Sequence, residues 1–170
     1  SLYLLNLIND SDDKYEFARL EKLISESKVK NAKLCYALAK NYEQRENYTK
    51  SLELYNQISP ANDEINLKKV CLNIIVENFD AALDILKEVN DKYENEKHFY
   101  KGLILFNQKE YEQALKTLDL IKDDPKFENK IPCLIAQCYI EQKKYRTVIN
   151  YIKKLEKNNI DFENKTDVYR

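Results

Sequence analysis

Glycine and proline are scarce in this chain of 170 residues, which has one glycine and three prolines. Turns must therefore be short and built mainly from Asn, Asp, Glu and Lys, which suits an all-α chain better than a β-rich one. The single glycine, Gly102, also excludes a glycine-rich phosphate-binding loop. The composition thus predicts helices joined by short polar connectors.

Histidine and closely paired cysteines, the common residues of catalytic and metal sites, are scarce as well. His98 is the only histidine, and the four cysteines form no C-x2-C pair. Cys133 and Cys138 are five positions apart, roughly 140° around a helix, so they point in different directions. Cys35 and Cys71 also lie in apolar stretches, as free buried thiols of a reducing compartment do. We therefore predict no enzymatic activity, no metal and no cofactor, and favour a cytoplasmic location.

Long apolar runs and an excess of positive charge are also missing. No apolar run approaches the roughly 18 residues that a membrane-spanning helix needs. The net charge of −1 argues against a general nucleic-acid binder. Residues 126–170 carry a net charge of +4 and residues 1–125 a net charge of −5. We interpret this mild asymmetry as solvated helix faces.

What the chain does contain is a repeat. An aromatic residue follows a short polar connector at intervals of 31 to 34 residues, at Tyr15, Tyr48, Phe79, Tyr111 and Tyr145. Three residues after each of these comes a mostly small or β-branched residue, at Ala18, Ser51, Ala82, Ala114 and Val148. Eight or nine residues before the last four aromatics lies a small residue in an apolar stretch, at Ala39, Cys71, Gly102 and Ala136. The agreement of these registers indicates a repeated pair of helices.

The repeat predicts where the helices lie. We expect pairs at about 31–44 and 47–58, 63–76 and 79–90, 94–108 and 111–122, and 130–142 and 145–157, preceded by a partial pair at 2–9 and 14–26. A glycine inside a helix costs about 1 kcal/mol relative to alanine and usually marks a close approach of two backbones. We interpret Gly102 as the tightest of four equivalent helix contacts, where substitution disrupts packing.

Several units carry parts of one consensus. The second unit has Cys35, Leu38, Ala39, Tyr42, Ser51, Tyr55 and Pro60. The third has Leu67, Val70, Cys71, Ile74, Ala82 and Leu86, and the fourth has Gly102, Leu105, Ala114, Leu118 and Pro125. The fifth has Ile135, Ala136, Tyr139, Val148 and Ile152. This series resembles the tetratricopeptide repeat (TPR), whose pattern W-x2-L-G-x2-Y, A-x3-F, P spans about 34 residues. The consensus tryptophan is absent throughout, Lys101 replaces its leucine in the fourth unit, and the first unit is poor.

The resemblance implies an all-α fold, a right-handed α-α superhelix of antiparallel helix hairpins. The repeats would span about 1–28 (partial), 31–60, 63–91, 94–125 and 129–158, with 159–170 as a tail or the start of a further helix. Each two-helix unit must stack on its neighbour, because it cannot bury both of its faces alone. We interpret residues 1–170 as a single solenoid that forms part of a longer chain, since neither end reads as a polar capping helix.

The resemblance also implies a function. In this family the first helices of the pairs line a concave groove that binds a peptide or a helix of a partner protein. Carried over by alignment, the partner-binding residues would be Lys33, Lys40, Lys68, Lys69, Leu72, Tyr100, Leu103, Phe106, Leu134 and Gln137. The lysines would face acidic groups of the partner, and the apolar residues would face its apolar side chains. The Lys/Asn clamp with which some members hold chaperone C-termini is not present, because Tyr36, Lys40 and Lys69 stand at its positions.

Two alternatives stay open at this point. The chain could be a structural segment of a long solenoid inside a multi-subunit assembly, with or without self-association through its edges. It could also bind RNA, as related helical-hairpin repeats do; a basic set near the C-terminus supports this, comprising Lys143, Lys144, Arg146, Lys153, Lys154 and Lys157. The slightly acidic chain makes nucleic-acid binding the least favoured reading.

Overall fold

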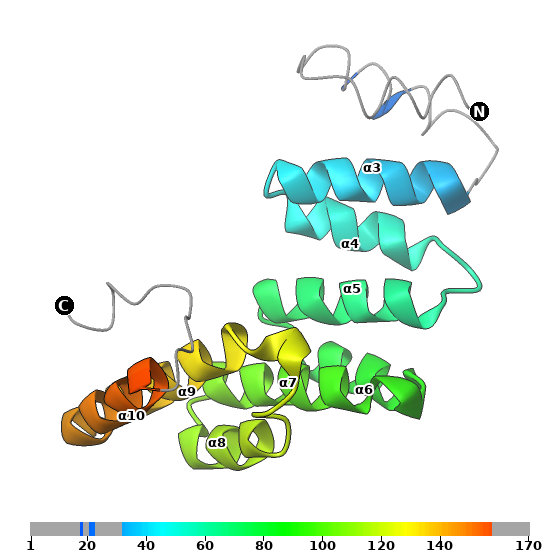
Figure 1. Cartoon of the computed structure of the whole chain (residues 1–170). Coiled ribbons are helices and arrows are strands. Elements are labelled where there is room, and N and C mark those ends of the chain that lie inside the picture. The colour runs from blue at the N-terminus through cyan, green and yellow to red at the C-terminus, as the bar shows by residue number, and fades with distance from the viewer. Residues whose placement is uncertain (1–17, 19–20, 23–31, 158–170) are drawn as a thin grey trace. The chain divides into compact units, whose positions relative to one another are not determined.

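The computed structural model describes residues 18, 21–22 and 32–157, and within them the secondary structure is entirely helical (Figure 1). Its α-helices are α3 (Ala32–Gln44), α4 (Tyr48–Asn56), α5 (Asp63–Ile75), α6 (Phe79–Glu88), α7 (Glu94–Asn107), α8 (Tyr111–Asp119), α9 (Lys130–Glu141) and α10 (Tyr145–Lys157). Two 3-10 turns, η1 (Asp91–Tyr93) and η2 (Pro125–Phe127), precede α7 and α9. The four complete helix pairs predicted from the repeat are confirmed, whereas the partial pair at 2–9 and 14–26 lies almost wholly outside the described residues.

The turn inside each hairpin is the same in all four pairs. In the first, the Asn47 amide donates to the Tyr42 carbonyl at 2.9 Å, and the Glu46 amide donates to the Glu43 carbonyl at 3.0 Å. These two bonds form a Schellman motif, which requires a left-handed residue just after the helix. The left-handed positions are Glu46, Glu77, Lys109 and Lys143, with φ between 57° and 65°. The chain therefore repeats this turn four times without using glycine in it.

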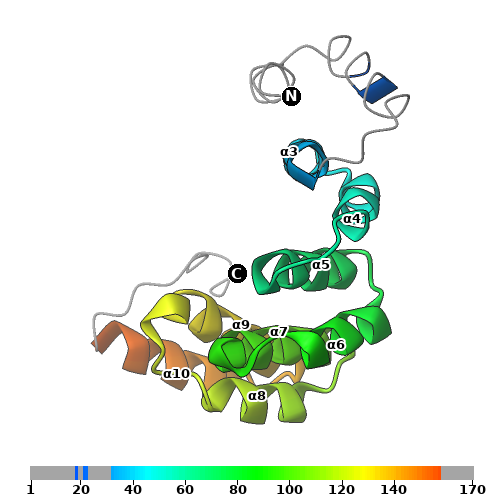
Figure 2. The ribbon, with the colours of Figure 1, turned by 90° about the vertical axis from the view of Figure 1, so that its right-hand side faces the viewer.

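Contacts divide the chain into two compact units, Ser1–Val89 and Asn90–Arg170. In the first unit, α3, α4, α5 and α6 pack in chain order, each against the next (Figures 1 and 2). Its main core cluster consists of Cys35, Ala39, Tyr55, Ile58 and Leu72. This unit is thus a stack of helix hairpins joined through α4 and α5.

In the second unit, α8 packs against both α7 and α9, and α9 packs against α10. Its main cluster consists of Leu118, Ile121, Phe127, Ile131, Leu134 and Ile135. The Phe127 ring stacks on Phe99 with ring centres 4.7 Å apart. The predicted fold class, all-α helix hairpins in a solenoid, is confirmed; the single span of 1–170 stays a prediction.

The small residues of the repeat lie where the helices of a pair touch. Ala39, Ala82, Ala114 and Ala136 are fully buried, and so is Ser51. Gly102 is buried as well, and a Cβ added there would lie 2.7 Å from Leu118 Cδ2. Cys71 is the exception among the first-helix positions, since it is only half-buried. The close contact of Gly102 is therefore made with the second helix of its own hairpin.

Candidate partner-binding surface

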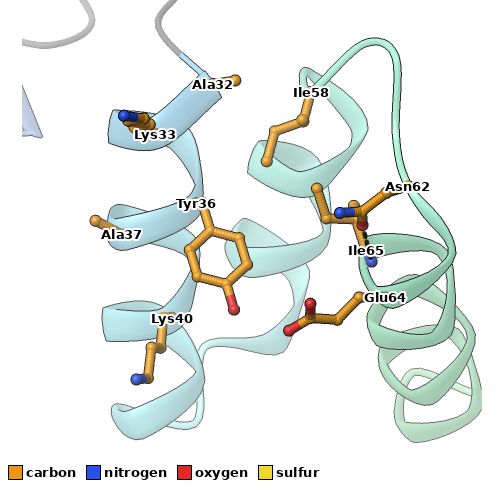
Figure 3. A pocket seen from close by; sticks show the side chains of 9 residues that line it. All are labelled: Ala32, Lys33, Tyr36, Ala37, Lys40, Ile58, Asn62, Glu64 and Ile65. Atoms are coloured by element: carbon orange, nitrogen blue, oxygen red, sulfur yellow. Dashed lines mark hydrogen bonds between the residues drawn. The ribbon is translucent and has the colours of Figure 1, made fainter.

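A cavity of about 500 Å³ lies in the first unit, on the side where α3 and α5 face each other (Figure 3). Its lining residues are Ala32, Lys33, Tyr36, Ala37 and Lys40 from α3, Ile58 and Asn62 from the connection between α4 and α5, and Glu64 and Ile65 from α5. Two residues predicted to bind a partner, Lys33 and Lys40, are thus brought together on one wall of a cavity.

The floor of this cavity is apolar and held by the core. Ile58 is 5% exposed and belongs to the core cluster, against which Tyr36 and Ile65 also pack. The Tyr36 ring meets the ring of buried Tyr55 edge-on, with centres 5.7 Å apart. Asn62 caps α5, because its Oδ1 accepts a hydrogen bond from the Ile65 amide at 2.9 Å. The floor and the adjoining helix start are therefore pre-formed, which lowers the entropic cost of binding.

The rim of the cavity carries charges of both signs. Lys40 is exposed on α3 and Glu64 is exposed in the first turn of α5, with the Tyr36 ring between them (Figure 3). Neither Lys40 nor Glu64 has a hydrogen bond or an ion pair with another of the described residues. Both charges are available to a ligand that spans the apolar floor.

The predicted residues of α5 differ in their surroundings, and contact of Lys68 and Lys69 with a partner stays a prediction. Lys68 Nζ lies 3.2 Å from Glu43 Oε2, while the Tyr55 hydroxyl donates to Glu43 Oε1 at 2.6 Å. Burial lowers the pKa of Lys69, and nearby Glu88 offsets part of this effect. Leu72 is 2% exposed and lies in the core cluster. The charge of Lys68 is thus partnered within the unit, and Leu72 acts as a core residue.

The predicted residues of the second unit also range from buried to exposed. Leu134 is a buried member of the core cluster, and Leu103 and Phe106 are half-buried against it. Tyr100 is half-buried and Gln137 is exposed. Contact of these side chains with a partner stays a prediction.

Sequence reasoning did not find Ile58, Asn62, Glu64 and Ile65 as lining residues. Ile58 and Asn62 lie in the connector between α4 and α5, and Glu64 and Ile65 lie in the first turn of α5. The signal that could have found them is the cap residue Asn62 after Pro60, which predicts that α5 begins beside the end of α4. Only the packing of α3 against this connection turns it into a cavity wall.

A second cavity, of about 630 Å³, lies in the second unit between α8, α9 and α10. At its rim Glu112 accepts hydrogen bonds from Lys144 at 2.7 Å and from Gln142 at 2.9 Å. The bond from Lys144 is the main reason that the pKa of Glu112 is lowered. This cavity involves none of the predicted partner-binding residues, and its rim pairs link α8 to the α9–α10 turn.

The described residues hold neither a metal-binding cluster nor a helix that could cross a membrane. No group of three or more His, Cys, Asp or Glu side chains there is arranged to hold a metal ion. No helix in the same residues has the length and apolar character to cross a membrane.

Comparison with known proteins identifies structural neighbours. No protein-family model matches the sequence, and no curated protein matches it significantly. A crystal structure of MamA protein is 19% identical and covers 93% of this chain and 91% of its own, with a TM-score of 0.68. YrrB, described as a TPR protein with an unusual peptide-binding site, is 16% identical and covers 89% of this chain and 82% of its own, with a TM-score of 0.61. Such likeness concerns the fold, and the chain has the tetratricopeptide-repeat fold that its sequence pattern predicts.

Proposed function

We propose that the chain is a non-enzymatic protein-interaction scaffold that binds a segment of a partner protein in the cavity between α3 and α5. The observation that carries this proposal is the cavity itself, which combines a fixed apolar floor with exposed charges. Protein pockets of about 300 to 1,000 Å³ with these features are the usual sites of ligand binding. The peptide-binding site for which YrrB is described supports a peptide ligand on this fold.

An apolar side chain of the partner would enter between Tyr36, Ile58 and Ile65. A volume of about 500 Å³ exceeds that of one side chain, so the ligand would contribute at least two neighbouring residues. Lys40 would attract an acidic group on one side of the apolar residue, and Glu64 a basic group on the other. Because these two charges stand on different helices, they would also fix the direction of the bound segment.

The experiment is a selection of peptides from a random display library against the 170-residue chain. Ala37→Trp places a large ring in the cavity and is expected to weaken the selected peptides at least about tenfold, a loss of 1.4 kcal/mol or more. Lys40→Glu is expected to weaken the peptides that carry an acidic residue next to the apolar one. Lys116→Glu, an equal charge reversal at an exposed position of α8, is the matched control and should leave binding unchanged.

Binding would be measured by titration calorimetry on variants whose helix content and unfolding midpoints match the parent protein. If the selected peptides bound Ala37→Trp as tightly as the parent, they would occupy another surface and the proposal would be wrong. If Lys116→Glu weakened them as much as Lys40→Glu, general electrostatics and not the cavity rim would explain the selection.

A further inference from the structure

The cavity of about 630 Å³ in the second unit, named here the α8–α10 cavity, has an apolar floor. Its most buried lining residues are Ile131 and Ile135 of α9, which belong to the core cluster of this unit. Leu115 of α8 and Leu155 of α10 also line it. Because the core holds these side chains in place, a ligand would meet a pre-formed apolar surface.

Two tyrosines add polar groups to this lining. Tyr139 of α9 and Tyr151 of α10 both line the cavity, and their rings meet edge-on with centres 6.3 Å apart. Neither hydroxyl forms a hydrogen bond with another of the described residues. Burial raises the pKa of Tyr151 to about 12, so its hydroxyl stays protonated at neutral pH and can donate a hydrogen bond. A tyrosine hydroxyl removed from water usually has a partner, so these two are the groups that a ligand would engage.

The charged side chains around the cavity fall into a paired set and an unpaired set. Four basic and four acidic side chains line it. Two of each sign form ion pairs, Lys144 with Glu112 at 2.7 Å and Lys122 with Asp119 at 2.8 Å. The exposed side chains that have no ion pair within the described part of the chain are Lys116, Lys154, Asp123 and Glu128. The unpaired lysines stand on α8 and α10, whereas the unpaired carboxylates lie in the connection between α8 and α9.

We propose that the α8–α10 cavity is a second binding site, which takes a segment of a partner protein with an apolar side chain between an acidic and a basic residue. The apolar side chain would lie on Ile131 and Ile135, and the two tyrosine hydroxyls would bind peptide groups of the segment. The acidic residue would face the unpaired lysines, and the basic residue the carboxylates of the connection.

The unpaired charges of both signs favour this ligand over a polymer of uniform charge such as RNA, which half of the unpaired set would repel. The second site does not depend on the α3–α5 cavity. With both sites, the chain would hold two partner segments at once.

The test selects peptides from a random display library against the 170-residue chain with Ala37→Trp, in which the α3–α5 cavity is filled. Tyr151→Phe removes only a hydroxyl and is expected to weaken the selected peptides about threefold to tenfold, as the loss of one hydrogen bond does. Tyr145→Phe is the matched control, because Tyr145 is on the same helix, is 59% exposed and does not line the cavity. Lys154→Glu should weaken the peptides by a similar factor, and Lys153→Glu, next to it but outside the lining, should not.

Affinities would be measured by titration calorimetry on variants whose unfolding midpoints match that of their parent. Peptides that bind the Tyr151→Phe and Lys154→Glu variants as tightly as the parent would show that they bind elsewhere, and the proposal would be wrong. Equal weakening by Lys153→Glu and Lys154→Glu would assign the effect to general electrostatics.

Two other occupants would also overturn the proposal. Dimers in sedimentation experiments that Lys154→Glu dissociates would assign the cavity to a second copy of the chain. Tighter peptide binding by a chain ending at Lys157 would assign it to the last residues of the chain itself. Because the α3–α5 cavity is filled in the selection, failure here leaves the first proposal standing.

Discussion

The hairpins α3–α4 and α7–α8 solve the same packing problem with different residues. Corresponding positions lie 63 residues apart, so that Ala39 matches Gly102 and Tyr55 matches Leu118. Both second-helix residues are fully buried, with 0% exposure. In α7–α8, Leu118 packs directly against the backbone of Gly102. In α3–α4, where Ala39 takes the place of the glycine, the longer Tyr55 side chain reaches Glu43 and donates a hydrogen bond to it. The repeat thus conserves a close contact between two helices and not a particular pair of side chains.

The comparison extends to polar groups. Ser51 in α4 matches Ala114 in α8, and both are fully buried. Ser51 Oγ has no hydrogen-bond partner within the described part of the chain. A buried hydroxyl without a partner costs free energy that a methyl group at the same place does not. The α7–α8 hairpin therefore gains stability from its apolar contact, while the α3–α4 hairpin gains it from the half-buried hydrogen bond between Tyr55 and Glu43 and loses some at Ser51.

The largest expected effect is at the centre of the α7–α8 contact. Leu118→Ala removes a fully buried side chain that lies directly over Gly102, and the glycine has no side chain of its own to fill the space. We expect a loss of about 3 kcal/mol in the free energy of unfolding, measured by urea denaturation followed by circular dichroism. Leu120→Ala, at a position that is 70% exposed, is the control and should change little. A loss no larger than that of Leu120→Ala would mean that the contact between Leu118 and Gly102 does not stabilise the α7–α8 hairpin.

The next effect tests the polar network of the α3–α4 hairpin. Tyr55→Phe removes the hydroxyl that donates to Glu43 at 2.6 Å and leaves the ring in place. Hydrogen bonds to charged groups contribute about 1.5 to 3 kcal/mol, so we expect a loss of about 2 kcal/mol in the free energy of unfolding. Glu43 keeps its contact with Lys68, which limits the loss. An unchanged midpoint of denaturation would mean that the ring alone stabilises this hairpin.

The pH dependence of stability provides a second test of the Tyr55 hydroxyl. Burial, followed by the hydrogen bond to Glu43, raises the pKa of the Tyr55 hydroxyl. The folded state therefore binds this proton more tightly than the unfolded chain, so the contribution is complete below about pH 10 and falls as the pH rises above it. Tyr55→Phe should lose less stability than the parent between neutral and alkaline pH. Equal slopes in denaturation series would contradict this assignment.

Gly102→Ala tests whether the close approach outweighs helix propensity. The added Cβ would lie 2.7 Å from Leu118 Cδ2 and 2.9 Å from its Cγ. Overpacking costs about 1 to 3 kcal/mol and alanine gains about 1 kcal/mol in helix propensity, so we expect a net loss of about 1 kcal/mol. In the Leu118→Ala background the clash is absent, and the same substitution should become stabilising. A double-mutant cycle without this change of sign would show that Gly102 serves another purpose.

Ser51→Ala should make the α3–α4 hairpin more like α7–α8. Replacing the unpartnered hydroxyl by a methyl group of similar shape is expected to raise the free energy of unfolding by about 1 kcal/mol. The reciprocal change, Ala114→Ser, buries a hydroxyl in the equivalent place and should lower it by a similar amount. Thermal denaturation of the two variants should therefore shift in opposite directions. Destabilisation by both would indicate that Ser51 Oγ has a partner, such as a bound water.

The sequence predicted the helices well because the apolar residues and the small residues both follow the helical period. Each predicted second helix begins within one residue of Tyr48, Phe79, Tyr111 or Tyr145, where a polar connector ends. The predicted surface was less well determined. The sequence pattern places Leu72 and Leu134 on the groove face, whereas the structure buries both side chains. Successive residues of a helix are about 100° apart, so an error of one position exchanges a groove position for a core position. The pairing of Lys68 with Glu43 depends on the packing of α5 near α3, which no local pattern in the sequence specifies.

The left-handed residues of the hairpin turns could not be predicted from the sequence, for a different reason. A left-handed residue after a helix is usually glycine, and this chain has charged residues there, so the sequence carries no sign of it. Glu46 and Lys109 match each other in the two compared hairpins, and both adopt a positive φ. The hydrogen bonds of the Schellman motif compensate for the unfavourable backbone conformation. This compensation can be measured because the side chains themselves are exposed.

The smallest expected effect is at this turn. Lys109→Gly relieves the left-handed strain, which is worth about 1 kcal/mol, but it also gives the unfolded chain more freedom. We expect a net gain of about 0.5 kcal/mol in the free energy of unfolding, and a similar gain for Glu46→Gly because the two turns have the same geometry. Gln113→Gly, inside α8, lacks such strain and should cost about 1 kcal/mol. Opposite signs at positions 109 and 113, only four residues apart, would locate the gain in the turn conformation. A loss at position 109 equal to that at position 113 would mean that the lysine side chain supports the turn.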